Sequence, residues 1–333
     1  MKSTLPFPQQ AETAWVVAAD LGASKVALGL IAPGDRIVAW RRMPTNADEG
    51  PQAVVERIAR QVAELERELP PASKIAALGI CTPGPVDHET GMLIEPPNLT
   101  GWRNVPFRQM LAERLGIPVA LEHDAKAAAL GEFHYGAGRG EQSMMFIVVG
   151  TGVGGASIIN GELYRGLSNT AGEIGHITLD PDGELCSCGN RGCVETFVSG
   201  PALARHYRRA LEGTGRSPEG SEPITGEVVA HLAREGDPLA LQVIEKAGQA
   251  LGTAIASAAM LLDINLYVVG SSVAKCGDLL LEPARRAVPR HAYPSVARRV
   301  RIVPSELCDD APLFGCGWLA RQLVGIQGEV RPG

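Results

Sequence analysis

Three cysteines and one histidine stand close together in the stretch HITLDPDGELCSCGNRGC. They are His176, Cys186, Cys188 and Cys193. Three thiolates and one imidazole form a Cys₃His set, which suits tetrahedral Zn²⁺. Because four protein ligands leave the ion no open position for water, the sequence predicts a structural zinc site that fixes this loop. The alternative is a loop of reduced cysteines without an ion.

A carboxylate and several hydrogen-bond donors meet in the turn DLGASK. Asp20 stands where an apolar run meets this turn, and Gly22, Ser24 and Lys25 follow it. The carboxylate could hold Mg²⁺ through bound water, and the donors could bind phosphate oxygens. The bland alternative is a β-turn made of small residues.

A second glycine-rich turn, GTGVGG at 150–155, formally satisfies G-x-G-x-x-G. A dinucleotide fingerprint must open a helix, whereas the next residues, ASIINGEL, have β character and an Asn-Gly turn of their own. The turn can still hold phosphate, since consecutive backbone N–H groups form an anion nest and Thr151 adds a hydroxyl. Together with the absence of a G-x-x-x-x-G-K-[ST] motif, this predicts a phosphate site that is neither a Rossmann turn nor a P-loop.

Strands and helices that alternate along the chain must position these turns. We expect strands at 15–20, 25–31, 75–80, 117–122, 144–149, 156–164 and 265–270. We expect helices at 51–69, 107–116, 124–136 and 237–262. Asp124 would be the N-cap of the third of these helices.

The pattern of strand, glycine turn and strand occurs twice, at 15–31 and at 144–164. A chain of 333 residues is also longer than one hydrophobic core usually supports. We therefore predict two similar halves that face each other across a cleft.

Charge and hydropathy exclude two classes of protein. The net charge is −6 at pH 7, and basic residues are scattered among acidic ones, which argues against a nucleic-acid surface. No apolar run is long enough to cross a bilayer, and the first ten residues lack the apolar core of a signal peptide. We expect a cytoplasmic protein without a membrane partner.

Seven segments together resemble the ROK family of sugar kinases and repressors, especially its bacterial glucokinase branch. They are DLGASK (20–25), GICTPGPVD (79–87), PNLTGW (97–102), LEHDAKAAALGE (121–132), GTGVGG (150–155), AGEIGH (171–176) and CSCGNRGCVE (186–195). The resemblance runs from about Trp15 to Leu323. It implies the actin-like ATPase (ribonuclease H-like) α/β fold, two domains that close on ATP and sugar, and assembly as a homodimer or homotetramer.

The domain boundaries that we predict follow from this fold. A disordered N-terminus would occupy 1–13, and a small α/β domain would comprise 14–122 and 312–333. The large α/β domain would span 123–311 and carry the zinc loop 176–193.

The resemblance also implies roles for individual residues. Asp124 matches the catalytic base, which accepts the proton of the attacking sugar hydroxyl; a buried capping aspartate is the alternative. Sugar contacts would come from Gly84, His123, Asp124, Glu173, His176 and Glu195. The ATP and phosphate frame would comprise Asp20, Gly22, Ser24, Lys25, Gly150, Thr151, Gly152, Gly270 and Ser271, with Mg²⁺ at Asp20.

His123 departs from the family pattern, which has Asn before the base. A neutral imidazole also offers a donor and an acceptor, but with a different reach. The acceptor is therefore glucose at its 6-hydroxyl or a modified sugar such as 3-amino-3-deoxyglucose, an N-acetyl hexosamine or a cyclitol. A non-catalytic sugar-sensing regulator is the alternative of another class, although only about fourteen residues precede the first expected strand, too few for the winged helix of the repressors.

Overall fold

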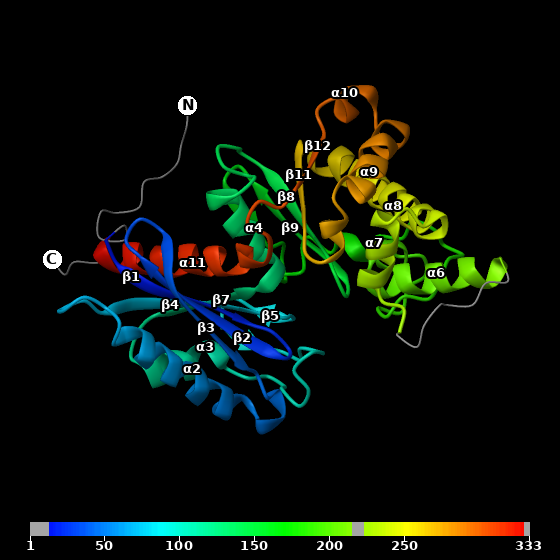
Figure 1. The fold of residues 1–333 in the computed structure, drawn as a ribbon. Coiled ribbons are helices and arrows are strands. Elements are labelled where there is room, and N and C mark those ends of the chain that lie inside the picture. The colour runs from blue at the N-terminus through cyan, green and yellow to red at the C-terminus, as the bar shows by residue number, and fades with distance from the viewer. Residues whose placement is uncertain (1–12, 215–222, 330–333) are drawn as a thin grey trace. The chain divides into compact units, whose positions relative to one another are not determined.

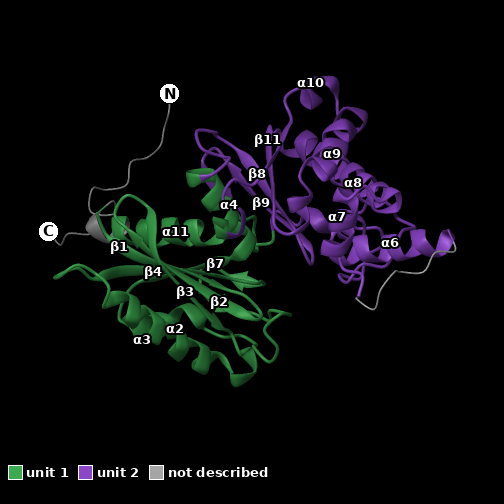
Figure 2. Cartoon of the chain, in the orientation of Figure 1, with its two compact units in different colours: residues 1–135, 165–170, 310–333 green, residues 136–164, 171–309 purple. Residues whose placement is uncertain are grey.

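The computed structural model describes residues 13–214 and 223–329 and divides them into two compact units (Figure 2). The first unit holds the chain up to Tyr135, the short segment 165–170 and the chain from Asp310 onward. The second unit holds 136–164 and 171–309. The first unit thus includes the helix that starts at Asp124, whereas the sequence predicts this helix in the large domain 123–311. Most of the N-terminal stretch that we expected to be disordered, residues 1–12, lies outside the described residues.

The first unit is built on a five-stranded sheet with the order β3-β2-β1-β4-β7 (Figure 1). β1 is antiparallel to β2, β2 is antiparallel to β3, and β1, β4 and β7 are parallel. The strands are β1 Trp15–Leu21, β2 Lys25–Ala32, β3 Arg36–Pro44, β4 Ile75–Thr82 and β7 Val119–His123. The predicted hairpin at 15–31 is confirmed.

Side chains of β1 alternate between two cores, as the pleat of a strand requires. Val17 and Ala19 pack in the core that includes α2 and α3, whereas Val16 and Ala18 pack in the core that includes α4 and α11. The sheet of the first unit therefore has helices on both faces (Figure 1). These helices are α2 Pro51–Glu66, α3 Phe107–Leu115, α4 Asp124–Tyr135 and α11 Ala311–Glu329.

Gly116 ends α3 in the left-handed conformation (φ 67°), which suits a residue without a side chain.

Shorter elements complete the first unit. A small ribbon and one 3₁₀ turn lie in the connections. They are η1 Ala47–Glu49, β5 Val86–Asp87 and β6 Met92–Leu93.

The second unit repeats the strand order of the first. Its sheet has the order β10-β9-β8-β11-β12, with β8–β9 and β9–β10 antiparallel and β8, β11 and β12 parallel. The strands are β8 Met144–Val149, β9 Val153–Ile159, β10 Glu162–Tyr164, β11 Leu266–Gly270 and β12 Arg301–Pro304. The predicted internal repeat is confirmed, but the second glycine turn is shorter than 150–155, because β9 already begins at Val153.

Helices of the second unit pack mainly through the long helix α8, which confirms the helix expected at 237–262 and is capped by Asp237. The helices are α5 Glu195–Val198, α6 Gly200–Gly213, α7 Gly226–Arg234, α8 Pro238–Leu262, α9 Asp278–His291 and α10 Pro294–Ala297. Single 3₁₀ turns are η2 Ile174–His176, η3 Val273–Cys276 and η4 Cys308–Asp310. Among the described helices, none has both the length and the apolar character to cross a bilayer.

Candidate active site

Thr45 fixes the turn between β1 and β2 through two hydrogen bonds. The Thr45 hydroxyl donates to the Gly22 carbonyl at 2.7 Å, and its amide donates to the Ser24 carbonyl at 3.0 Å. Across the turn, the Gly22 amide donates to the Lys25 carbonyl at 2.9 Å. Gly22, Ser24 and Lys25 therefore lie in one ordered backbone arrangement that directly follows Asp20 and Leu21 of β1.

Asp20 is a half-buried carboxylate beside a thiol. Its Oδ1 lies 3.4 Å from the Cys81 Sγ on the neighbouring strand β4. Burial raises the pKa of Asp20 to about 6; the negative charge of Asp124 adds to this rise, and Cys81 and Lys25 oppose it. The sequence does not reveal this contact, because the two residues are 61 positions apart in the chain.

Asp124 lies where β7 passes into α4. We expected an N-cap, but α4 begins at Asp124 itself, and Oδ1 accepts the N–H of the next residue, Ala125, at 2.6 Å. A carboxylate in the first turn of a helix is stabilised by the helix dipole. The Asp124 side chain is 43% exposed, so it remains accessible although the Ala125 amide holds it in place.

His123 packs against the turn at Gly84. A Cβ added at Gly84 would lie 2.6 Å from the His123 Cδ2, so only glycine fits beneath this ring. The His123 Nδ1 is buried and has no hydrogen-bond partner, although it lies 3.2 Å from the Asp124 Oδ1. The structure therefore places His123 between Gly84, which it contacts, and Asp124.

The glycine turn of the second unit lies against two other segments. The Gly150 amide donates to the Gly152 carbonyl at 2.9 Å, and the Gly150 carbonyl accepts the Gly200 amide at 2.8 Å. A Cβ at Gly150 would lie 2.9 Å from the Ser271 Oγ. Ser271 adopts φ 80°, a conformation that favours glycine. The turn Gly150, Thr151 and Gly152 thus lies beside Ser271, which follows Gly270 at the end of β11.

Glu195 joins this glycine turn to the cysteine loop. Its Oε2 accepts the Val153 amide at 2.9 Å and would lie 2.6 Å from a Cβ at Gly152. Its Oε1 accepts the Ser187 hydroxyl at 3.2 Å. The sequence predicts Glu195 as a sugar contact, and the structure shows that it also fixes the start of β9.

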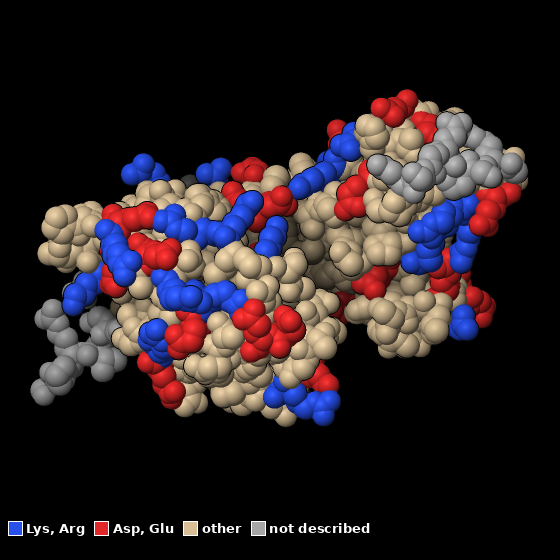
Figure 3. Space-filling view, turned by 60° about the horizontal axis from the view of Figure 1, so that its bottom comes forward, with Lys and Arg blue, Asp and Glu red and all other residues tan. Residues whose placement is uncertain are grey.

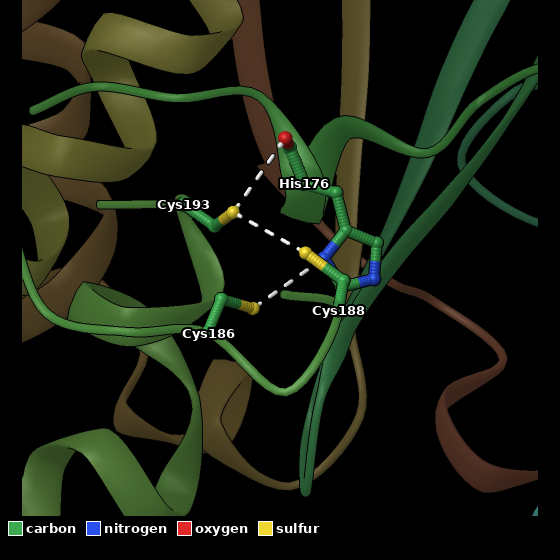
Figure 4. A group of neighbouring side chains, drawn as sticks. All are labelled: His176, Cys186, Cys188 and Cys193. Carbon is green, nitrogen blue, oxygen red and sulfur yellow. Dashed lines mark hydrogen bonds between the residues drawn. The ribbon is translucent and has the colours of Figure 1, made fainter. Parts of the chain in front are cut away.

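The predicted zinc ligands converge at one point (Figure 4). The ligand atoms of His176, Cys186, Cys188 and Cys193 all lie within 4.8 Å of one another. The His176 Nδ1 is 3.7 Å from the Cys186 Sγ, and the Sγ atoms of Cys188 and Cys193 are 3.7 Å apart. This donor set and its spacing fit one tetrahedral Zn²⁺.

The thiols of Cys188 and Cys193 have pKa values that are shifted in opposite directions. Burial raises the pKa of Cys193 to about 12, and the neighbouring thiols add to the rise. The backbone N–H of Asn190 lowers the pKa of Cys188. A metal would have to displace the proton of Cys193, since thiolates are the ligands.

Glu173 and His176 flank the short turn η2. The Glu173 carbonyl accepts the His176 amide at 3.1 Å, so the backbone fixes both residues in one turn. Of the predicted residues, Asp20, Gly22, Ser24, Lys25, Gly84, His123 and Asp124 belong to the first unit. Gly150, Thr151, Gly152, Glu173, His176, Cys186, Cys188, Cys193, Glu195, Gly270 and Ser271 belong to the second.

Two sheets with the same strand order, each opened by a hairpin with a glycine turn, define the actin-like ATPase fold. The chain belongs to the ROK family, whose sequence profile matches residues 16–323.

Individual relatives include both enzymes and regulators. A glucokinase of Halalkalibacterium halodurans is 34% identical over 92% of this chain and 95% of its own. The crystal structure of a ROK family glucokinase from Streptomyces griseus in complex with glucose and AMPPNP is 33% identical, with a TM-score of 0.77 over 93% of this chain and 100% of its own. A putative xylose repressor of Caldicellulosiruptor sp. is 31% identical over 90% of this chain and 76% of its own.

Proposed function

We propose that this protein is an ATP-dependent sugar kinase that transfers a phosphoryl group to the 6-hydroxyl of glucose. Two of its relatives are glucokinases, and one of them was crystallised with glucose and AMPPNP. The observation that carries the proposal is the placement of Asp124: an accessible carboxylate, fixed at the start of α4 by the Ala125 amide, in the electrostatic field of Asp20.

In the proposed reaction, Asp124 accepts the proton of the sugar hydroxyl. The hydroxyl oxygen forms a bond to the γ-phosphorus of ATP, the bond to the bridging oxygen breaks, and ADP leaves with that electron pair. Phosphoryl transfer depends mainly on alignment and on stabilisation of charge. The fixed rotamer of Asp124 supplies the alignment of the base.

The nucleotide frame that we propose consists of the three turns. Backbone amides near Gly22 and Gly150, the hydroxyls of Ser24 and Thr151, and the Lys25 ammonium would contact phosphate oxygens, and the turn at 270–271 would lie beside the nucleotide. Asp20 would hold Mg²⁺ through bound water. The raised pKa of Asp20 supports this, because it reflects a buried negative charge that a cation would offset. Mg²⁺ would supply neutralisation of phosphate charge there.

The sugar contacts that we propose are the main chain at Gly84 and the side chains of His123, Asp124, Glu173, His176 and Glu195. If the Nδ1 of His176 binds zinc, its Nε2 remains available to a sugar hydroxyl. A metal ligand held in this way has its ring orientation fixed. The cysteine loop would thereby orient one of the sugar-binding residues.

His123 supports a second candidate acceptor, a modified sugar such as 3-amino-3-deoxyglucose, an N-acetyl hexosamine or a cyclitol. Its Nδ1 is buried without a partner, and its ring covers Gly84. An imidazole in this position presents a different shape and hydrogen-bonding pattern from an asparagine. Values of kcat/KM for glucose and for each of these sugars decide between the two candidates.

A substitution of the base tests the proposed chemistry. Asp124→Asn keeps the shape of the side chain but cannot accept the proton, so we expect turnover to fall by at least ~100-fold while glucose binding is largely kept. Steady-state kinetics and calorimetric glucose titration measure the two effects. Asp237→Asn, which alters the cap of α8 in the second unit, is the matched control and should retain turnover. Wild-type turnover in Asp124→Asn would remove Asp124 from the role.

We further propose that the Cys₃His cluster binds a structural Zn²⁺. Metal analysis of the purified protein should find about one zinc ion per chain, because the four ligands form one closed site. Cys188→Ser should lose the ion and lower the melting temperature, whereas Cys308→Ser, at an exposed cysteine outside the cluster, should do neither. A protein that is metal-free at unchanged melting temperature and turnover would contradict the site.

The remaining proposals concern setting and partners. We propose a cytoplasmic enzyme, where ATP is supplied, that acts as a homodimer or homotetramer. Acidic and basic side chains are interspersed on the face of the molecule in Figure 3, which does not favour a nucleic-acid partner for that face. A sugar-sensing regulator, suggested by the repressor relative, would bind sugar without sugar-dependent ATP turnover.

A further inference from the structure

A buried ion pair lies directly before the proposed base. Glu122, at the end of β7, is only 1% exposed, which is rare for a carboxylate unless it is paired. Its Oε2 accepts a hydrogen bond from Arg165 Nε at 2.9 Å and forms an ion pair with Arg165 Nη2 at 2.8 Å. Its Oε1 accepts the backbone N–H of His123 at 2.9 Å. One carboxylate thus joins a guanidinium to the peptide that leads into Asp124.

Arg165 lies in a short segment that belongs to a different unit from its neighbours in the chain. Residues 165–170, here called the strap, belong to the first unit, although the chain on either side of them belongs to the second. At the far end of the strap, the Asn169 carbonyl accepts a hydrogen bond from Lys126 Nζ, and Asn169 Nδ2 donates to the Val86 carbonyl, both at 2.9 Å. The strap is therefore anchored at both ends to elements next to the proposed site.

These anchors involve residues close in sequence or in space to the proposed base. Lys126, on the first turn of α4, is 1% exposed, so its contact with the strap is shielded from water. Val86 lies two residues after Gly84, against which His123 packs. A hydrogen bond that involves a charged group and is shielded from water is stronger than one at the surface, and it fixes the direction of both partners.

We infer that Glu122 and Arg165 are positioning residues for the proposed base. The guanidinium fixes the Glu122 carboxylate, the carboxylate fixes the His123 amide, and this holds His123 and Asp124 in the orientation that the reaction needs. This inference rests on the proposed role of Asp124. A merely structural pair would stabilise the fold without changing turnover of the folded protein.

A positioning role and a merely structural role predict different effects of substitutions at Glu122 and Arg165. A single change, Arg165→Met or Glu122→Gln, leaves the other charge without its partner and is expected to destabilise the protein. The double variant Glu122→Gln/Arg165→Met removes both charges, so it should fold, yet the link from the strap to His123 is still lost. Arg165→Lys keeps the charge but loses the fork of two donors.

The experiment measures kcat, the KM for glucose and the melting temperature of these variants, with assays kept well below each melting temperature. For the double variant we expect kcat to fall at least ~tenfold, since small displacements of a reacting group are costly. Arg165→Lys should recover part of the loss. Arg114→Met, which breaks an exposed ion pair with Glu56 in the same unit, is the matched control and should keep wild-type kcat.

A kcat in the double variant within twofold of wild type would overturn the inference, even if the melting temperature falls. Asp124→Asn in the same series separates this failure from that of the proposed function. If Asp124→Asn is inactive and the double variant is active, only the positioning role is wrong. If Asp124→Asn turns over normally, the assignment of the base is wrong as well.

Discussion

Asp20 and Asp124 lie at the ends of parallel strands β1 and β7, which flank β4 in the first sheet. Each carboxylate is fixed by a neighbour, Cys81 for Asp20 and the Ala125 amide for Asp124. Their mutual repulsion contributes to the raised pKa of Asp20. The site thus concentrates negative charge where the proposed reaction brings a cation, which is a cost to stability in the absence of substrates.

A substitution at Asp20 should reveal this cost. The folded pKa of about 6 lies above the ordinary value of 3.8, so the folded protein holds this proton more tightly. Stability therefore falls as the pH rises through this interval, and the loss persists above it. At pH 8, without Mg²⁺ and nucleotide, Asp20→Asn should be more stable than wild type by on the order of 3 kcal/mol, but much less active.

Chemical denaturation at pH 8 and at pH 4 measures the effect, and the advantage of Asp20→Asn should shrink at the lower pH. A variant that is less stable than wild type at pH 8 would show that the charge of Asp20 is already offset in the free protein.

At the same scale, the sequence predicts local chemistry better than distant contacts. The cysteine cluster and the turn at Asp20 are readable because their residues are close in the chain. The partner of Glu122 is not, because Arg165 is 43 residues away and an arginine in a loop carries no signal of its own. A charged residue within the strand 117–122 was the only available hint, since buried charges need partners.

At the scale of secondary-structure elements, helices α4 and α11 of the first unit pack closely against each other. A Cβ at Gly131 would lie 2.1 Å from the Ala311 carbonyl oxygen, and one at Gly315 would lie 1.8 Å from the Ala127 carbonyl oxygen. The two helices therefore pack with their backbones in close approach. The sequence predicts the start of α4, but the partner helix and this close contact depend on tertiary packing that periodicity does not reveal.

His134 gives this helix pair a pH dependence. Its ring stacks on Trp318 with centroids 4.3 Å apart, and its Nε2 is buried without a hydrogen-bond partner. Burial lowers the pKa of His134 to about 4 from the usual 6.5. Because the unfolded chain binds the proton first, stability is lost as the pH falls below 6.5 towards 4.

His134→Phe should remove this loss while keeping the stack. Relative to wild type, we expect the variant to gain roughly 2 kcal/mol on going from pH 7 to pH 5, as measured by chemical denaturation. His291→Phe, at an exposed histidine of the second unit, is the control. An equal pH dependence in wild type and His134→Phe would show that His134 is already solvated in the folded protein.

The whole molecule is a duplication. Each unit has a five-stranded sheet with two antiparallel strands at one side and parallel strands at the other, and each first hairpin carries a glycine turn. The repeat of strand, turn and strand predicts this much from the sequence. It does not predict the boundaries, because the chain passes between the units more than once and returns to the first one for only six residues at 165–170.

The central claim is that this ROK family protein uses ATP to phosphorylate glucose. The most direct measurement incubates the purified protein with Mg²⁺-ATP and glucose and quantifies ADP and glucose 6-phosphate, with parallel samples of the modified sugars. We expect both products in equal amounts and in dependence on glucose, with both lost in Asp124→Asn. Sugar binding without ADP formation for any sugar in the panel would contradict the claim and identify the protein as a regulator.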